Sequence, residues 1–258
     1  MNIATVLFTL PDKRGDPTHF TAIWGRKAVA LSKSLGYKTV VLSGNQTTHA
    51  NVSSALIKYN PRVVIHYGHG CRTNLQGQDG CIITRNYNTN ELMEMAQGSI
   101  EDRIKLLKIL DFEKQPLGQL SCPGICNIDS DPCADRCKDD TNVGLLKDKI
   151  ILTTACFSAD QLGKCAISSG ADGYKGFDDL FLFPTDGMES QNLFGDLELI
   201  FIRELLLGKT IDEAEAVMSE KEDILITKFK PIKYMSLSLL WNKIHRKTLG
   251  NLDATIYY

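Results

Sequence analysis

The chain has 258 residues, of which 43% are hydrophobic, and 29 basic and 31 acidic residues give a formal net charge of -2. This length and composition fit one large α/β domain, and the near-neutral balance gives no reason to expect nucleic acid or an anionic membrane as a partner. No apolar run is long enough to cross a bilayer, and no basic segment precedes the apolar start. We therefore expect a cytoplasmic protein with no membrane partner, in which thiols stay reduced.

The first half of the sequence alternates between strand and helix patterns. Short apolar runs predict strands at 3–10, 38–42 and 62–67, and apolar spacings of three and four predict helices at about 18–35 and 52–59. Repeated β-α-β units with short connections indicate a mainly parallel sheet with helices on both faces. Functional groups of such sheets gather beyond the carboxyl ends of the strands. The residues directly after the third predicted strand are Gly68, His69 and Gly70.

Residues from about 77 to 148 break this rhythm and are interpreted as an insertion in a single domain that spans 1–258. The alternation then resumes with a strand predicted at 149–155, which places Cys156 at its carboxyl end. Ser158 and Gln161 have the spacing of a capping box, which predicts a helix that begins just after Cys156.

Further elements are predicted after this helix. Strands are expected at 171–177 and 180–183, and a long helix carries Leu197, Phe201 and Leu205 on one face. Thr210 and Glu213 predict a capped start for the next helix.

His69 and Cys156 are the candidate catalytic pair. The carboxyl ends of neighbouring parallel strands meet at one edge of a sheet, so an imidazole and a thiol placed there can share a proton. A helix N-terminus just after Cys156 would favour its thiolate form. The backbone N–H groups of Gly70 and Cys156 are candidates for an oxyanion hole. His66, on the predicted strand itself, is interpreted as a buried histidine whose hydrogen bonds are satisfied.

The segments 64–70 and 153–158 resemble the clan of cysteine peptidases that includes caspases, legumains, clostripain, separase and gingipains. Members of this clan share an apolar strand that ends in His-Gly and a later apolar strand that ends in Ala-Cys. The pairs Leu162-Gly163, Ala166-Ile167 and Gly170-Ala171 make the sequence most similar to the gingipain branch. The resemblance implies a three-layer caspase-like α/β fold, a His69–Cys156 dyad, and oxyanion donors at Gly70 and Cys156.

Three residues near the predicted strand ends are candidates for contact with substrate. In several relatives the residue two before the cysteine lines the primary specificity pocket, and here this residue is the neutral Thr154. Asp178 and Asp179, after a predicted strand, are candidates for an acidic contact to substrate, although exposed Asp pairs are also common turn formers.

Four cysteines of the insertion form a second candidate site. Two Cys-x3-Cys pairs have a spacing that suits a tetrahedral, structural zinc ion, and a pair of disulfides in an oxidising compartment is the alternative. The four residues are Cys122, Cys126, Cys133 and Cys137.

The sequence as a whole therefore predicts a cysteine endopeptidase that forms a thioester acyl-enzyme with a protein or peptide substrate. Because relatives are often held latent, a regulatory protein partner is also expected. The alternative is a catalytically silent scaffold or binding module of the same fold, with a structural zinc knuckle as the element that faces a partner.

Overall fold

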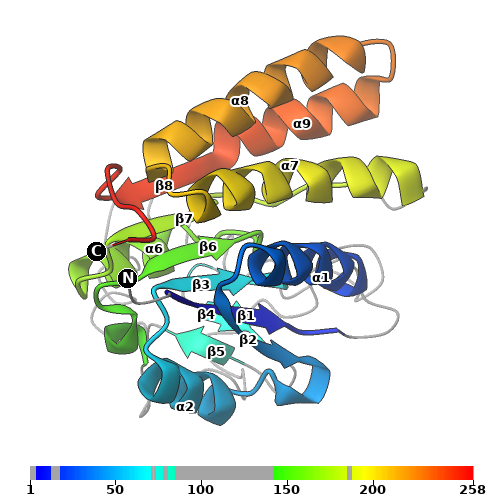
Figure 1. The fold of residues 1–258 in the computed structure, drawn as a ribbon. Helices are drawn as coiled ribbons and strands as arrows, with labels where there is room; N and C mark the ends of the chain where they lie inside the picture. Colours follow the sequence, from blue (N-terminus) through cyan, green and yellow to red (C-terminus); the bar gives the residue numbers. More distant parts are fainter. Residues whose placement is uncertain are drawn as a thin grey trace, which may run out of the picture.

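A six-stranded sheet forms the centre of the computed structural model, which describes residues 4–12, 18–70, 72, 74–77, 81–84, 142–184 and 188–257 (Figure 1). The strand order is β2-β1-β3-β6-β7-β8. The first five strands in this order are parallel, whereas β8 runs antiparallel to β7. The strands are β1 (Thr5–Leu10), β2 (Lys38–Ser43), β3 (Val63–His66), β6 (Ile150–Thr153), β7 (Gly173–Phe177) and β8 (Arg246–Gly250).

Helices cover both faces of the sheet, so the protein has three layers, as the alternating pattern predicted (Figure 1). One face packs against α1 (Thr18–Ser34) and α7 (Met188–Leu206), and the other against α2 (His49–Tyr59) and α6 (Gln161–Ser168). Beyond α7 lies a helical hairpin made of α8 (Ile211–Lys228) and α9 (Lys233–His245). The α/β class and the mainly parallel sheet are confirmed.

The two apolar cores follow from the alternation of side chains along each strand. In β3, Val63 and Ile65 point to the α1–α7 face, whereas Val64 points to the α2–α6 face, and all three are buried. Each such side chain stabilises the fold by about 1.5–3 kcal/mol relative to an exposed position. A strand buried on both faces reads as a continuous apolar run, which is why the sequence revealed β1 and β3.

Residues with special backbone conformations end the first two helices. Gly36 follows α1 with φ of +85°, and Asn60 caps α2 in the left-handed region directly before Pro61. At the start of α8, Glu213 N–H donates to Thr210 Oγ1 (3.1 Å), and Thr210 N–H donates to Glu213 Oε2 (2.9 Å). The predicted capping box of α8 is therefore confirmed.

Two expectations about the region after β6 are wrong. The helix does not begin just after Cys156, because α6 starts at Gln161 and its N-cap, Asp160, makes no side-chain capping bond. Phe157 has φ of +55°, which a right-handed helix does not accept, so a turn separates β6 from α6. Residues 180–183 form no strand, because the side chain of Asn242 takes both backbone groups of Leu182.

A small antiparallel hairpin follows β3 and consists of β4 (Asn74–Gln76) and β5 (Cys81–Thr84). The two ends of the predicted insertion both pack on the sheet: Ile83 from β5, and Val143 and Leu146 from the 3-10 helix η3 (Val143–Leu146), lie in the α2–α6 core. A second 3-10 helix, η1 (Gly44–Gln46), follows β2. The cysteine cluster at 122–137 lies outside the described residues.

Candidate active site

The two sequence motifs meet at the carboxyl ends of β3 and β6. His66 is the register partner of Thr153, and Thr154 N–H donates to the His66 carbonyl (3.3 Å). A methyl group added to Gly70 would lie 2.6 Å from Ala155 Cβ and 3.2 Å from the Cys156 carbonyl oxygen. The chain that follows His69 therefore touches the segment that contains Cys156, and only glycine fits at this contact.

Cys156 lies in a turn with an unusual backbone. The thiol is half-buried, and the next residue, Phe157, has the left-handed φ described above. Phe181 N–H donates to Cys156 Sγ (3.3 Å). The sequence had predicted a helix N-terminus beside this sulfur, whereas the structure places the amide of a loop residue there.

The segment that presents this amide is held by α9. Asn242 pairs with both backbone groups of Leu182: its Oδ1 accepts from the Leu182 N–H (2.8 Å), and its Nδ2 donates to the Leu182 carbonyl (2.7 Å). Trp241 Nε1–H donates to the Leu180 carbonyl (3.0 Å). Both neighbours of Phe181 are thus fixed by adjacent side chains of one helix, which positions the Phe181 amide against the sulfur.

His66 holds the backbone of His69. Its Nε2 lies 3.1 Å from the His69 carbonyl oxygen, and its Nδ1 lies 2.9 Å from Thr9 Oγ1. Because a carbonyl oxygen only accepts hydrogen bonds, Nε2 carries the proton and Nδ1 accepts from the Thr9 hydroxyl. Burial lowers the pKa of His66 to about 4, so the ring is neutral at neutral pH. The interpretation of His66 as a buried, hydrogen-bonded histidine is confirmed.

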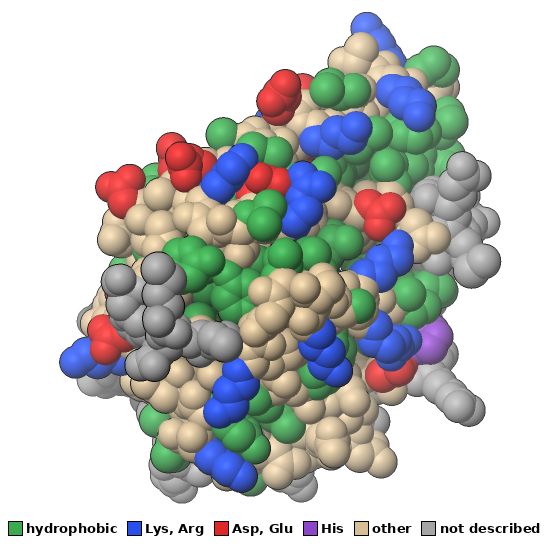
Figure 2. Space-filling model, viewed as in Figure 1, with side chains coloured by type: hydrophobic (Ala, Val, Ile, Leu, Met, Phe, Trp, Pro, Cys, Tyr) green, Lys and Arg blue, Asp and Glu red, His purple; other side chains and the backbone are tan. Residues whose placement is uncertain are grey.

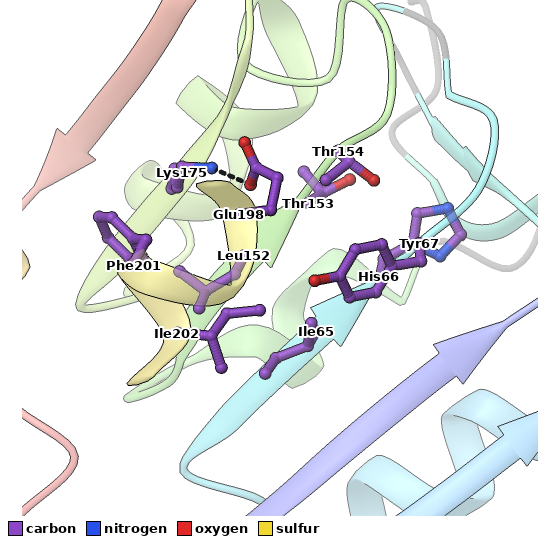
Figure 3. Close-up of a pocket in the computed structure, with 10 residues that line it drawn as sticks. All are labelled: Ile65, His66, Tyr67, Leu152, Thr153, Thr154, Lys175, Glu198, Phe201 and Ile202. Atoms are coloured by element: carbon purple, nitrogen blue, oxygen red, sulfur yellow. Dashed lines mark hydrogen bonds and ion pairs between the residues drawn. The ribbon is translucent and has the colours of Figure 1, made fainter. Parts of the chain in front are cut away.

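A small cavity of about 10 Å³ lies beneath these strand ends, between β3, β6, β7 and α7 (Figure 3). Its walls include the buried side chains of Tyr67 and Thr154. Neither the Tyr67 hydroxyl nor Thr154 Oγ1 has a hydrogen-bond partner among the described residues. Burial, and secondarily the charge of Glu198, raise the pKa of Tyr67 well above its ordinary value, so Tyr67 remains a hydroxyl donor.

A buried ion pair forms another wall of the cavity. Lys175 Nζ donates to Glu198 Oε2, and both side chains are at most 5% exposed (Figure 3). The ammonium also lies over the rings of Phe177 (5.5 Å) and Phe201 (5.2 Å). These contacts compensate the cost of removing the Lys175 charge from water. The ion pair also links the middle of β7 to α7.

The candidate substrate-binding residues lie in different surroundings. Thr154 faces the cavity, whereas Asp178 is paired with His245 Nδ1 (2.8 Å) and with Lys247 Nζ (3.2 Å). Asp179 Oδ1 accepts from the Leu180 N–H (2.7 Å). The structure therefore places Thr154 beneath the site and engages both aspartates in contacts within the chain.

Sequence reasoning missed the Phe181 amide, the Asn242 contacts and the Lys175–Glu198 pair. A signal for the pair was present, because Lys175 interrupts an otherwise uncharged strand and Glu198 falls on the apolar face of α7 beside Leu197 and Phe201. A backbone amide leaves no signal in residue type, so the Phe181 contact is visible only in three dimensions.

No protein-family model and no curated protein sequence matches the chain. The part of the chain that the structure describes contains no group of three or more His, Cys, Asp or Glu side chains arranged to hold a metal ion. Among the same residues, no helix is both long and apolar enough to span a membrane.

Proposed function

We propose that the chain is a cysteine endopeptidase with a caspase-like fold, in which Cys156 is the nucleophile and His69 is its acid–base partner. The observation that carries this proposal is the contact of Gly70 with Ala155 and Cys156 at the carboxyl ends of two adjacent parallel strands. This contact supports the convergence of the His-Gly and Ala-Cys motifs on one site.

In the proposed reaction, the Cys156 thiolate attacks the carbonyl carbon of the scissile peptide bond. The backbone N–H groups of Gly70 and Cys156 stabilise the oxyanion, and protonated His69 gives its proton to the leaving amine as the C–N bond breaks. Water then attacks the thioester while neutral His69 accepts its proton; the C–S bond breaks, the carboxylic acid leaves, and the Cys156 thiolate and protonated His69 are restored.

Substrate would lie over the edge where β3 and β6 end, with Thr154 beneath it. The pairing of Asp178 with two basic groups favours a role for that carboxylate in the fold over a contact to a basic substrate side chain. Zinc at Cys122, Cys126, Cys133 and Cys137 stays a prediction, for which metal analysis of the purified protein is the test.

A covalent probe experiment tests the peptidase proposal. Reduced protein is treated with a panel of peptidyl acyloxymethyl ketones that differ in the residue before the reactive group, and peptide mapping locates the adduct. We expect one adduct, on Cys156, and a rate at least about 100-fold lower in His69→Ala. Cys165→Ser is the matched control, because Cys165 is also a half-buried free thiol, and it should label like the parent protein.

Equal, slow labelling of Cys156 and Cys165, or an unchanged rate in His69→Ala, would contradict the proposal. Either result would favour the alternative of a scaffold with the same fold.

A further inference from the structure

The helical hairpin α8–α9 carries exposed apolar side chains, most of which the packing described above does not use; Trp241, whose indole N–H holds Leu180, is partly exposed at their edge. Seven of the twelve large apolar side chains that are exposed among the described residues lie between positions 224 and 244. The inner face of α9 is already buried through Met235 and Leu239. A second apolar stripe that remains exposed marks an interaction site. The seven residues are Ile224, Ile232, Tyr234, Leu237, Leu240, Trp241 and Ile244.

Charge is separated along the same hairpin. Residues 224–252 contain six Lys and Arg and no acidic residue. Three of the six lie at the base of the hairpin and are neutralised by ion pairs: Lys243 with Asp223, Arg246 with Glu222, and Lys247 with Asp178. At the opposite end, Asp212 and Asp253 are exposed and adjacent, since Asp212 N–H donates to the Leu252 carbonyl (3.1 Å). Figure 2 shows apolar and basic side chains toward the tip of the hairpin, at the upper right, and acidic side chains interspersed with basic ones toward its base at the left. The basic residues of the tip are exposed and have no ion-pair partner among the described residues; they are Lys228, Lys230 and Lys233.

We propose that two copies of this chain associate through their α8–α9 hairpins in antiparallel orientation. In this arrangement the outer face of α9 packs against the same face of the second copy. The basic tip of each hairpin then lies beside the acidic base of the other, as a twofold axis requires. The dimer does not depend on peptidase activity.

The separation of unpaired charge between tip and base favours a second copy of the chain, rather than an anionic membrane, as the partner of this surface. α8 has 18 residues and is therefore about 27 Å long, which keeps tip and base far apart. A negatively charged lipid surface would attract the tip but repel the base, whereas a second antiparallel hairpin satisfies both ends.

Sedimentation velocity of the reduced, full-length protein over about 1–100 μM tests the proposal. We expect a concentration-dependent equilibrium between monomer and dimer. Leu237→Glu with Ile244→Glu should raise the dissociation constant at least about 100-fold, because it places four carboxylates in the apolar contact. Ile57→Glu is the matched control: Ile57 is 68% exposed and Leu237 63%, and Ile57 lies on α2, at the opposite side of the molecule.

Charge reversal tests the orientation of the two hairpins. Lys230→Glu with Lys233→Glu should weaken the dimer about 10-fold or more, and addition of Asp212→Lys and Asp253→Lys should restore it. A monomer at every concentration, or a dimer unaffected by the Leu237 and Ile244 substitutions, would overturn the proposal. So would failure of the second charge reversal to restore association, or binding of the monomer to phosphatidylserine–phosphatidylcholine vesicles through this surface.

Discussion

Buried, neutral His66 should make the stability of the protein depend on pH. The pKa of this ring is lowered by burial from 6.5 to about 4. In the unfolded chain the His66 ring therefore takes up a proton as the pH falls through about 6.5. In the folded protein the same ring stays neutral down to about pH 4. The contribution of the neutral ring to stability is complete above the unfolded pKa and is lost progressively below it.

The magnitude follows from the two pKa values. The difference of about 2.5 units corresponds to about 3 kcal/mol once both states are protonated, and to about 2 kcal/mol at pH 5. His66→Gln is the informative variant, because the glutamine Nε2 donates as the imidazole Nε2 does, toward the His69 carbonyl, but does not titrate.

Urea unfolding followed by tryptophan fluorescence measures the effect, with buried Trp24 as a core probe. The free energy of unfolding of the parent protein should fall by about 2 kcal/mol more than that of His66→Gln between about pH 7 and pH 5. If both proteins lose the same free energy over this range, the ring is not buried and neutral, and its assigned role in holding the His69 carbonyl is refuted.

Two other substitutions test contacts around the site. Asn242→Leu removes both hydrogen-bond partners of the Leu182 backbone and should destabilise the protein by about 2–4 kcal/mol. It should also slow iodoacetamide alkylation of Cys156, measured by peptide mapping. An unchanged alkylation rate would show that α9 does not position the Phe181 amide against Cys156. Glu198→Gln leaves the ammonium of Lys175 buried without its partner and should lower the free energy of urea unfolding by about 3–5 kcal/mol. The double variant with Lys175→Met should recover most of this lost stability. A loss below about 1 kcal/mol in the single variant would argue against a buried ion pair.

The layered fold could be predicted because its signals are local. A buried parallel strand is a short apolar run, and a surface helix repeats its apolar residues every three or four positions, so β1, β3, α1 and α8 were readable from the sequence. The convergence of Gly70 with Cys156 could also be expected, because topology sets which strand ends are neighbours.

The errors arose where a local signal competed with a long-range one. Ser158 has capping-box spacing, but its hydroxyl donates to the Ala155 carbonyl (2.8 Å) and the turn at Phe157 delays the helix. The apolar run at 180–183 suits a strand, yet Asn242, 60 residues away along the chain, takes the Leu182 groups that a ladder would use. Such partners cannot be inferred from spacing within a window of sequence.

The whole-chain charge concealed a further feature. A net charge of -2 from 60 charged residues suggests an evenly mixed surface, but Lys228, Lys230 and Lys233 lie together at the tip of the hairpin, whereas the other basic residues of 224–252 are paired with carboxylates. A sum over the chain cannot show segregation, so the polarity of the hairpin emerges only when the charges are placed on α8 and α9.

The hold of α9 on the Leu180–Leu182 segment also sets an order of events during synthesis. Every strand of the sheet from β1 to β7 precedes residue 178, so the parallel core can assemble on the ribosome before α9 exists. Trp241 and Asn242 emerge more than 60 residues after β7 has been made, and only then is the Phe181 amide fixed against Cys156. A nascent chain therefore carries the thiol without its completed surroundings until α9 has been synthesised.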